Sequence, residues 1–322
     1  MTRNSGHSNF RNLIRKGYKR VLGQSSPLLF KLISFPVALL PLRIATGVGG
    51  AVGWLFYHLS RRTRGRAIQN IANSLPFLER HPKWDKTHGS AEQIARRAFA
   101  NLGRSFAEVV KIYHGHGRQI IDSVEIRGIE YYYRAKEQGK GIILITGHCG
   151  DWELMALTLG VRVERINVLA RPLKEAYLND LLEKVRRTFG NEVIYKKGAA
   201  RSILAVLREQ GVVGVLMDVS VKPLDGILTD FLGRPAWTGT LPANICKKTG
   251  VPLLPVFIHR EEDRHVIDFH PPVVVEGDNV DMSTRKLSQV IEEYIAQYPD
   301  EWLWIYRRWK RAADRQQRSL SL

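Results

Sequence analysis

An uninterrupted apolar run, residues 142–145, stands between glycines and then gives way to a polar turn. The turn carries His148, Asp151 and Glu153, and a second apolar segment follows it. A short apolar run of this kind is typical of a buried β-strand. Because open α/β sheets place their sites beyond the carboxyl ends of their strands, the pattern predicts a strand, a turn that carries chemistry, and a helix.

Short apolar runs and helical patterns alternate through the middle of the chain. Strands separated by helices pair in parallel through crossover connections. The pattern therefore predicts an α/β fold with a central, largely parallel or mixed sheet flanked by helices. Besides the strand at 142–145, the expected elements are strands at 124–127, 166–170, 193–195, 212–217, 253–259 and 266–270, and helices at 130–137, 176–189, 199–209 and 287–297.

Two further stretches have recognisable patterns. Residues 90–93 read Ser-Ala-Glu-Gln, the spacing of a capping box, and the apolar positions that follow as far as Tyr113 recur at helical intervals. A short helix is expected at 66–75, ended by Pro76. Residues 218–240 are rich in glycine and proline, and we expect a long loop that interrupts the alternation.

The segment between Lys31 and His58 is apolar, with Arg43 as its one charged residue. A spanning helix needs about 20 apolar residues, but Pro36, Pro41 and several glycines interrupt this one. We expect a tilted or broken membrane anchor, or two short helices that lie in the membrane interface. An ordinary buried helix pair with a solvated basic face is the alternative. The absence of a small-residue cleavage site disfavours a cleavable signal peptide.

The formal net charge of +18 indicates a polyanionic partner, either nucleic acid or an acidic membrane surface. Twelve Lys or Arg residues precede Glu79, which is the first acid of the chain. Several of them bracket the apolar segment, a membrane pattern rather than one for binding nucleic acid. The two cysteines, Cys149 and Cys246, make neither a disulfide framework nor a zinc pattern, which is consistent with a reducing cytoplasm.

His148 and Glu153 are the candidate catalytic pair. A step of five residues turns a helix by about 140°, so the two side chains can meet only if His148 lies in the bend and Glu153 in the first helical turn. Gly147 and Gly150 permit such a bend. A neutral imidazole can then take a proton from a hydroxyl while the carboxylate orients it. A purely structural histidine is the alternative, and Cys149 is a poor nucleophile because neighbouring residues in a turn point apart.

The chain resembles the bacterial lipid A biosynthesis acyltransferases, the lauroyl and myristoyl late acyltransferases, within the lysophospholipid acyltransferase superfamily. The resemblance runs in order along nearly the whole chain. It rests on the basic apolar N-terminus, His148 through Glu153, Arg171-Pro172, Asp218, the stretch Phe231-Leu232-Gly233-Arg234-Pro235-Ala236 and the tail Trp304-Ile305-Tyr306-Arg307-Arg308. The sequence departs from the family where Asp151 stands in place of a common asparagine, Tyr306 in place of a common histidine, and Asp218-Val219-Ser220 in place of Asp-Gln-Asp.

The resemblance implies transfer of an acyl chain from an acyl-carrier-protein thioester to a hydroxyl of a lipid A precursor or related glycolipid. His148 would be the general base and Glu153 its partner, with no acyl-enzyme, no cofactor and no metal. Residues 1–66 would anchor the chain and 67–322 would form the catalytic domain, at the cytoplasmic face of the inner membrane.

The resemblance also supplies the candidate substrate-binding residues. Arg171 would bind a phosphate of the acceptor through its guanidinium. The alternative is that Arg171 only forms a salt bridge at the surface. Asp218 would belong to the acceptor site, and the loop that carries Phe231, Gly233 and Thr238 would border the acyl pocket. Arg307, in the tail, completes the set.

Two other functions remain open. One keeps the chemistry and changes the acceptor to a phosphatidylinositol mannoside, a lysophospholipid or an ornithine lipid. The other is a non-catalytic basic protein that binds a membrane surface or nucleic acid. The concentration of basic residues around an apolar segment disfavours nucleic acid, and an acidic acyl carrier protein suits the same basic surface.

Overall fold

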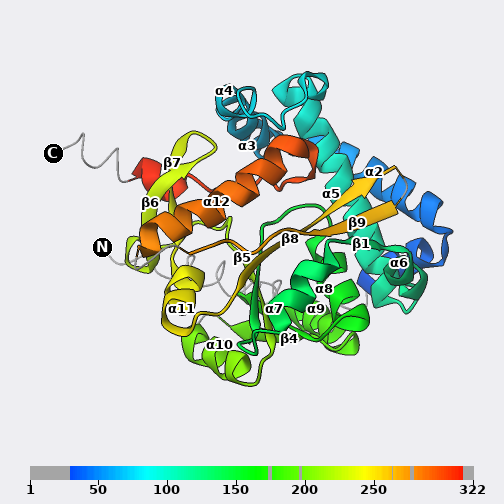
Figure 1. Ribbon diagram of the computed structural model, residues 1–322. Helices are drawn as coiled ribbons and strands as arrows, with labels where there is room; N and C mark the ends of the chain where they lie inside the picture. Colours follow the sequence, from blue (N-terminus) through cyan, green and yellow to red (C-terminus); the bar gives the residue numbers. More distant parts are fainter. Residues whose placement is uncertain (1–29, 173–175, 196–197, 263, 276–278, 315–322) are drawn as a thin grey trace, which may run out of the picture.

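The computed structural model describes residues 30–172, 176–195, 198–262, 264–275 and 279–314. Its centre is a mixed sheet of seven strands in the order β1-β9-β8-β2-β5-β3-β4, drawn in Figure 1. Every pair of neighbours is parallel except β8 and β9. The expected α/β class and mixed sheet are confirmed. The strands are β1 (Glu125–Arg127), β2 (Ile142–Thr146), β3 (Ile166–Ala170), β4 (Glu192–Tyr195), β5 (Val212–Leu216), β8 (Leu253–Glu261) and β9 (Arg264–Phe269).

The central strand β2 is buried on both faces, as its unbroken apolar run predicts. Ile143 and Ile145 pack into one core, and Ile142 and Leu144 pack into the other. Helix α12 contributes to the first core and α8 to the second, and Figure 1 shows them on opposite sides of the strands. The first core also takes side chains of α10 (Ala199–Arg208), α11 (Leu241–Thr249) and α12 (Val280–Gln297), and the second those of α6 (Arg118–Ser123), α7 (Ile129–Lys136), α8 (Trp152–Arg162) and α9 (Ala176–Thr188).

Helix α12 begins seven residues earlier than the sequence pattern indicates. Asn279 caps it, because its side chain accepts a hydrogen bond from the N–H of Met282. Its first turns contain buried Ser283 and Thr284, whose hydroxyls donate hydrogen bonds to the backbone carbonyls of Asn279 and Val280. Polar residues satisfied in this way hide a helical face from a search for apolar periodicity.

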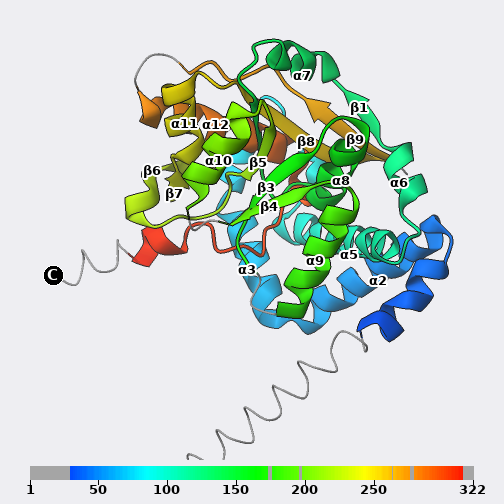
Figure 2. The same cartoon turned by 90° about the horizontal axis from the view of Figure 1, so that it is seen from below.

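The N-terminal region is helical across the glycines that we expected to interrupt it. Residues 30–39, which include Pro36, are helical, and α2 (Leu42–Leu59) follows Pro41. The helical segment is therefore interrupted only before α2, at Pro41. A Cβ on Gly53 would lie 2.0 Å from the carbonyl oxygen of Phe99, and one on Gly49 would lie 2.3 Å from that of Gly103. These glycines allow the backbone of α2 to touch that of α5 (Ala91–Tyr113), which lies alongside it in Figure 2. The glycines therefore serve helix packing and not helix termination.

The capping box at the start of α5 is confirmed: the side chain of Ser90 accepts from Gln93 N–H, and Gln93 accepts from Ser90 N–H. Between α2 and α5 lie α3 (Arg61–Ala72), α4 (Leu75–Leu78) and the short helix η1 (Lys86–His88). The predicted domain boundary at residue 66 falls within α3. The basic residues at 11–20 lie outside the described residues.

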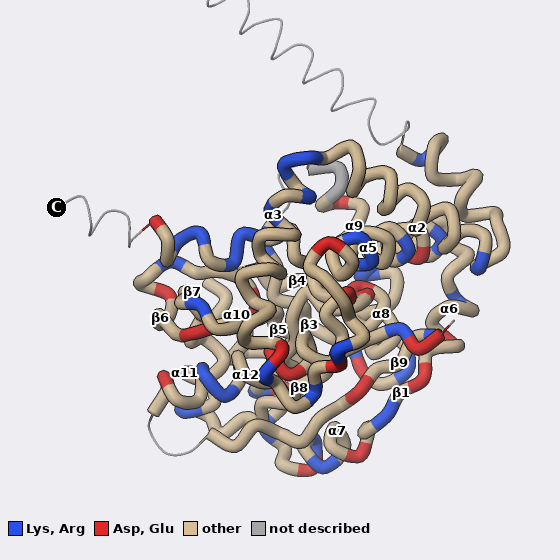
Figure 3. The backbone as a smooth tube through the Cα atoms, turned by 90° about the horizontal axis from the view of Figure 1, so that it is seen from above, with Lys and Arg blue, Asp and Glu red and all other residues tan. Residues whose placement is uncertain are grey.

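Apolar side chains remain exposed along the first helices. Ile44, Val48, Val52, Leu55 and Leu59 follow one another at intervals of three or four residues and so share one face of α2, and each is between 38% and 72% exposed. Figure 3 shows Lys and Arg along the adjoining α3. In the part of the chain that the structure describes, none of the helices combines the length and the apolar character needed to cross a membrane.

The expected loop at 218–240 contains a β-hairpin, formed by β6 (Gly226–Phe231) and β7 (Arg234–Gly239). The turn residues Leu232 and Gly233 both have positive φ, 50° and 73°, which suits a two-residue hairpin turn. Pro235, which argued against a strand, lies opposite Asp230 in this isolated two-stranded ladder. The expected long loop does interrupt the alternation, but part of it is a hairpin, because proline is tolerated on an edge strand.

Candidate functional site

The register of two neighbouring strands brings His148 beside Asp218. Strands β2 and β5 are parallel, and Thr146 at the end of β2 pairs with Leu216 at the end of β5. The N–H of Met217 extends the ladder by donating to the carbonyl of Thr146 at 2.8 Å. His148 and Asp218 each follow their strand end by two residues, so they lie at equivalent places on the same edge of the sheet.

Asp218 holds His148 at two points. Its Oδ1 lies 2.9 Å from Nδ1 of the imidazole, and its Oδ2 accepts the backbone N–H of His148 at 2.8 Å. The indole N–H of Trp302 donates to the same Oδ2, also at 2.8 Å. Asp218 is only 1% exposed, so these bonds replace the water that a buried carboxylate has lost.

These contacts would suit an imidazole that acts as a base. A carboxylate on Nδ1 favours the tautomer with its proton there, which leaves Nε2 free to accept a proton. Burial by itself would lower the pKa of His148, but the charge of Asp218 and its hydrogen bond raise that pKa above its usual value. Burial opposes the charged form of Asp218, yet His148 and the other donors hold the pKa of Asp218 below its usual range.

Glu153 does not occupy the place that the sequence analysis gave it. Its Oε2 accepts from Nε of Arg186, on α9, at 3.0 Å, and its Oε1 forms a second bond to Nη2 of the same guanidinium. Both side chains are largely buried, 16% and 12% exposed. The orienting contact on Nδ1 comes from Asp218, whereas Glu153 acts on His148 only through its charge, which also raises the pKa of the imidazole.

A segment from the end of the chain forms one wall of the site. The N–H of Leu303 donates to the carbonyl of His148 at 3.1 Å, and the N–H of Gly150 donates to that of Glu301 at 2.7 Å. The ring of Tyr306 lies nearly parallel to the imidazole of His148, with an angle of 17° and 6.1 Å between centroids. The turn that contains His148 and Gly150 is thus hydrogen-bonded to a segment about 150 residues further along the sequence.

His148 opens into a cavity of about 1430 Å³. Ligand sites usually measure roughly 300–1,000 Å³, so this one has room for a long chain. Glu153, Arg186 and Tyr306 also line it, and Arg171, which is exposed, lies at its edge. Apolar side chains form most of its wall, among them Leu144, Met155, Leu159, Ile166, Val168 and Val256.

Five of the six predicted substrate-binding residues lie outside this lining, and one of them is Asp218, which is buried against His148. Phe231 is fully buried, and its ring packs against those of Trp302 and Trp309. Thr238 is also fully buried and accepts a hydrogen bond from Arg308. Gly233 forms the hairpin turn beside Phe77, in a separate hollow, and Arg307 is exposed. The hairpin borders the cavity only at its end, through Gly239 and the adjoining Thr240, whereas Phe231, Gly233 and Thr238 lie away from the cavity.

Cys149, beside the base, is buried against Trp302 and is 1% exposed. Burial raises the pKa of its thiol well above the usual value. A thiol that resists ionisation is a poor nucleophile, in agreement with the sequence analysis.

Charged groups are buried directly behind the turn. Glu108 receives Nη1 and Nη2 of Arg260 at 3.1 and 2.8 Å, and it lies 3.0 Å from Nε2 of His265. Asp151 caps α8 by accepting the N–H of Leu154, and burial raises the pKa of Asp151 well above its usual value. Glu108, Asp151 and His265 bring possible ligand atoms within 4.8 Å of one another. Both oxygens of Glu108 already accept a hydrogen bond from the guanidinium of Arg260, so a metal ion there would compete with that ion pair.

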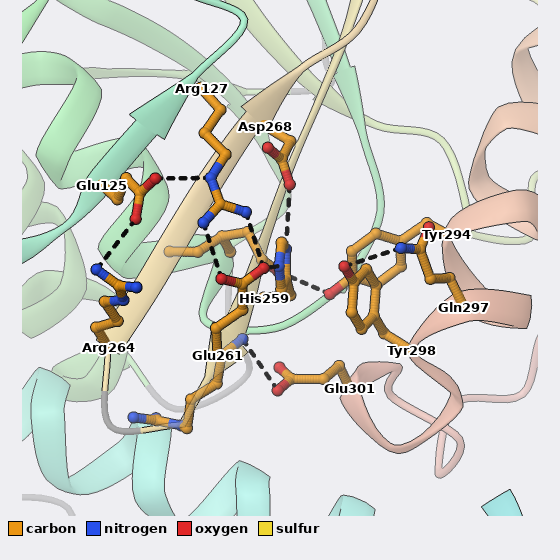
Figure 4. Close-up of polar contacts among 12 residues, drawn as sticks. Glu125, Arg127, His259, Glu261, Arg264, Asp268, Tyr294, Gln297, Tyr298 and Glu301 are labelled. Carbon is orange, nitrogen blue, oxygen red and sulfur yellow. Dashed lines mark hydrogen bonds and ion pairs between the residues drawn. The ribbon is translucent and has the colours of Figure 1, made fainter. Parts of the chain in front are cut away.

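A second polar network, drawn in Figure 4, links the C-terminal segment that contains Tyr298 and Glu301 to the edge of the sheet. Glu261 binds Arg127 through both oxygens and accepts from His259 at 3.0 Å. The ring of His259 stacks on Tyr298, 4.2 Å away, just before η3 (Pro299–Glu301). Glu301 in turn accepts the N–H of Arg260. Strands β1 and β8 therefore fix the segment that reaches the catalytic turn.

Sequence reasoning missed three contributors to the site: Arg186, Trp302 and Tyr306. Arg186 left no local signal, because it lies in the last turn of an amphipathic helix where basic residues are common. The alternation of aromatic and basic residues at the end of the chain was noticed, but nothing in it indicates contact with His148. Asp218 follows a buried strand, as His148 does, so the sequence marks it as a candidate. The sequence does not show that β2 and β5 are neighbours in the sheet, and so it could not place Asp218 beside His148.

Comparison with known proteins agrees with this architecture. The chain is 22% identical to a lipid A biosynthesis acyltransferase of Haemophilus influenzae over 274 residues, 84% of this chain and 82% of that protein. It is 25% identical to a phosphatidylinositol mannoside acyltransferase of Mycobacterium tuberculosis, with 83% and 89% covered, and 22% identical to a lipid A biosynthesis lauroyltransferase of Escherichia coli, with 85% and 88% covered. A family model described as bacterial lipid A biosynthesis acyltransferase matches residues 24–311. With nine-tenths of its length matched in this way, the chain belongs to the bacterial lipid A biosynthesis acyltransferase family.

Proposed function

We propose that the protein transfers a fatty acyl chain from an acyl-carrier-protein thioester to a hydroxyl of a lipid A precursor or related glycolipid. The observation that carries the proposal is the hydrogen-bonded pair of His148 and Asp218 at an apolar cavity of about 1430 Å³. A base beside a long apolar cavity suits a reaction between a hydroxyl and the carbonyl of a fatty acyl chain.

In the proposed reaction the acceptor hydroxyl gives its proton to Nε2 of His148, and its oxygen attacks the thioester carbonyl. The tetrahedral intermediate then collapses, the carbon–sulfur bond breaks, and the thiolate leaves with the proton from His148. Asp218 stabilises the imidazolium between these steps, and Glu153 adds a second negative charge nearby. No acyl-enzyme is needed, because the cavity holds the donor beside the acceptor.

Arg171 is the proposed contact for an acceptor phosphate, since its guanidinium is exposed at the edge of the cavity. Arg307 is exposed beside Tyr306; burial lowers the pKa of Arg66, and the nearby charge of Arg307 lowers it further. A polyphosphorylated headgroup would relieve this repulsion. Phosphatidylinositol mannoside is a second candidate acceptor, supported by the 25% identity to an enzyme of that name.

The exposed apolar face of α2 and the arginines of α3 support membrane association, with the site at the cytoplasmic face of the inner membrane. The same basic surface would attract the acidic acyl carrier protein. In this arrangement both lipid acceptor and protein donor approach the cavity from the basic side.

The proposal is tested by acyl transfer from acyl-carrier-protein thioester to a Kdo-lipid A precursor, with the enzyme in detergent. His148→Ala should lose at least about 100-fold in kcat, because general base catalysis contributes roughly 10²–10⁴. His116→Ala, which changes an exposed histidine on the loop after α5, is the matched control and should keep full activity. Undiminished transfer by His148→Ala would refute the mechanism, and transfer to a phosphatidylinositol mannoside instead would favour the second acceptor.

A further inference from the structure

The hydroxyl of Tyr306 has an unusual environment next to the base. Tyr306 lines the cavity, and its ring lies nearly parallel to that of His148. Its Oη accepts a hydrogen bond from the backbone N–H of Ser220 at 3.3 Å. Within the described residues, no group accepts the hydroxyl proton of Tyr306. A tyrosine hydroxyl both accepts and donates, so a donor is available at the cavity beside the base.

The peptide that joins Val219 and Ser220 is polarised toward this hydroxyl. Nη1 of Arg308 donates to the carbonyl oxygen of Val219 at 3.1 Å, while the N–H on the other side of the same peptide donates to Tyr306. Arg308 is fully buried, so water does not screen its charge. Chained hydrogen bonds strengthen one another, and this chain runs from a guanidinium through a peptide to the tyrosine O–H.

Arg308 itself is turned away from the substrate. Nη1 also donates to the carbonyl of Trp237 at 2.7 Å, and Nη2 donates to the hydroxyl of Thr238. The guanidinium does not line the cavity. Its positive charge therefore acts without touching the substrate, through the peptide and the hydroxyl of Tyr306 and through its attraction to Asp218.

We infer that Tyr306 is a further catalytic residue, whose hydroxyl donates a hydrogen bond to the thioester oxygen as negative charge develops there. This inference rests on the proposed function, because it needs a thioester carbonyl in the cavity. When the acceptor oxygen attacks, the carbonyl π electrons move onto oxygen, and the Tyr306 O–H stabilises that oxyanion without giving up its proton. When the carbonyl re-forms, the carbon–sulfur bond breaks and the thiolate takes its proton from His148.

The position of the hydroxyl fits this role. A base must reach the attacking hydroxyl and an oxyanion donor must reach the carbonyl oxygen, each at about 3 Å from the same reacting group. Tyr306 and His148 lie far apart in the sequence, yet both line the same cavity, with 6.1 Å between the centroids of their rings. A donor fixed by the Ser220 N–H and by ring packing needs little reorganisation during the reaction.

The decisive variant is Tyr306→Phe, which keeps the ring and removes only the hydroxyl. It should lower kcat by about 100-fold with little change in the KM for the donor, since the loss of one oxyanion donor costs roughly 10²–10³ in kcat. Tyr306→His, which restores a ring with an N–H donor, should recover part of the loss. Tyr133→Phe is the matched control, because Tyr133 is 56% exposed on α7.

Binding of donor analogues separates a catalytic from a structural role. A trifluoromethyl ketone analogue forms a tetrahedral adduct and should bind Tyr306→Phe more weakly by a factor similar to the fall in kcat. An ether analogue without a carbonyl should bind the wild type and the variant equally. Equal loss for both analogues, or an unchanged kcat, would overturn the inference. If His148→Ala stays active as well, the proposed function fails, whereas loss in His148→Ala alone refutes only the role of Tyr306.

Discussion

Among single residues, Asp218 carries the main correction to the sequence analysis. It was expected among the substrate contacts, and it lies instead on Nδ1 of His148, where Glu153 had been placed. The spacing of His148 and Glu153 is local and visible in the sequence. The contact with Asp218 depends on two strands that are separated by β3 and β4 along the chain and become neighbours only in the sheet.

The pH profile of Asp218→Asn tests this assignment. His148 must be neutral to act as the base, so activity should rise with pH through its raised pKa. Removing the negative charge lowers that pKa, and the acidic limb of kcat/KM should move to lower pH. The plateau should also fall by about 10²–10⁴-fold, because an amide favours the wrong tautomer.

Two further variants serve as comparisons in this experiment. Glu153→Gln removes a more distant charge and leaves Nδ1 paired, so it should shift the limb less. Asp122→Asn changes an exposed acid of α6 that pairs with Arg118, and its profile should match the wild type. An acidic limb that stays in place in Asp218→Asn would show that Asp218 does not control the imidazole.

At the scale of elements, the sequence predicted what depends on local pattern. The strands at 142–146, 166–170 and 212–216 and the capped start of α5 were found because burial on both faces and a capping box leave local signatures. The hairpin β6–β7 and the first turns of α12 were missed, since their proline and hydroxyl residues are tolerated only in their tertiary setting. The glycines of α2 were misread for the same reason: their partner is α5.

The crossing of α2 and α5 can be tested with two alanines in one helix. Gly53→Ala places a Cβ 2.0 Å from the carbonyl oxygen of Phe99, so it should destabilise the protein by about 1–3 kcal/mol or more. Gly47→Ala meets nothing within 4 Å and should be neutral or stabilising by up to about 1 kcal/mol, because alanine favours the helix. Thermal unfolding of both variants measures the difference. Equal melting temperatures would show that the helices do not touch at Gly53.

On the scale of the whole molecule, charge and apolar surface are separated in space. Besides the exposed apolar face of α2, the preceding helix exposes Ile33 and Leu39, and the next helix, α3, carries arginines. Single exposed apolar residues are ordinary, but a contiguous patch rimmed by positive charge is typical of a surface that meets lipid. The composition of the first 78 residues predicts a lipid contact on this side of the molecule, and that contact stays a prediction.

Sedimentation with lipid vesicles tests the surface. The protein should bind vesicles that contain anionic lipid more tightly than neutral ones, and added salt should weaken the binding. Ile33→Glu and Leu59→Glu, at positions 67% and 72% exposed, should each reduce binding about tenfold or more, because burial of one such side chain contributes roughly 1.5–3 kcal/mol. Val274→Glu, at a position 69% exposed in another region, is the control. Equal binding by all three variants would exclude this face as the lipid contact.

The wall formed by residues 301–306 affects how the site can form during synthesis on the ribosome. Chains fold broadly from the N-terminus as they are made, so the apolar helices and the strand that carries His148 emerge well before Trp302 and Tyr306. Until those residues arrive, Asp218 lacks its indole donor and the catalytic turn lacks the strand-like partner that binds its backbone. Residues 301–306 therefore complete the hydrogen bonds around His148 and Asp218 only after the strands that carry those two residues have been made.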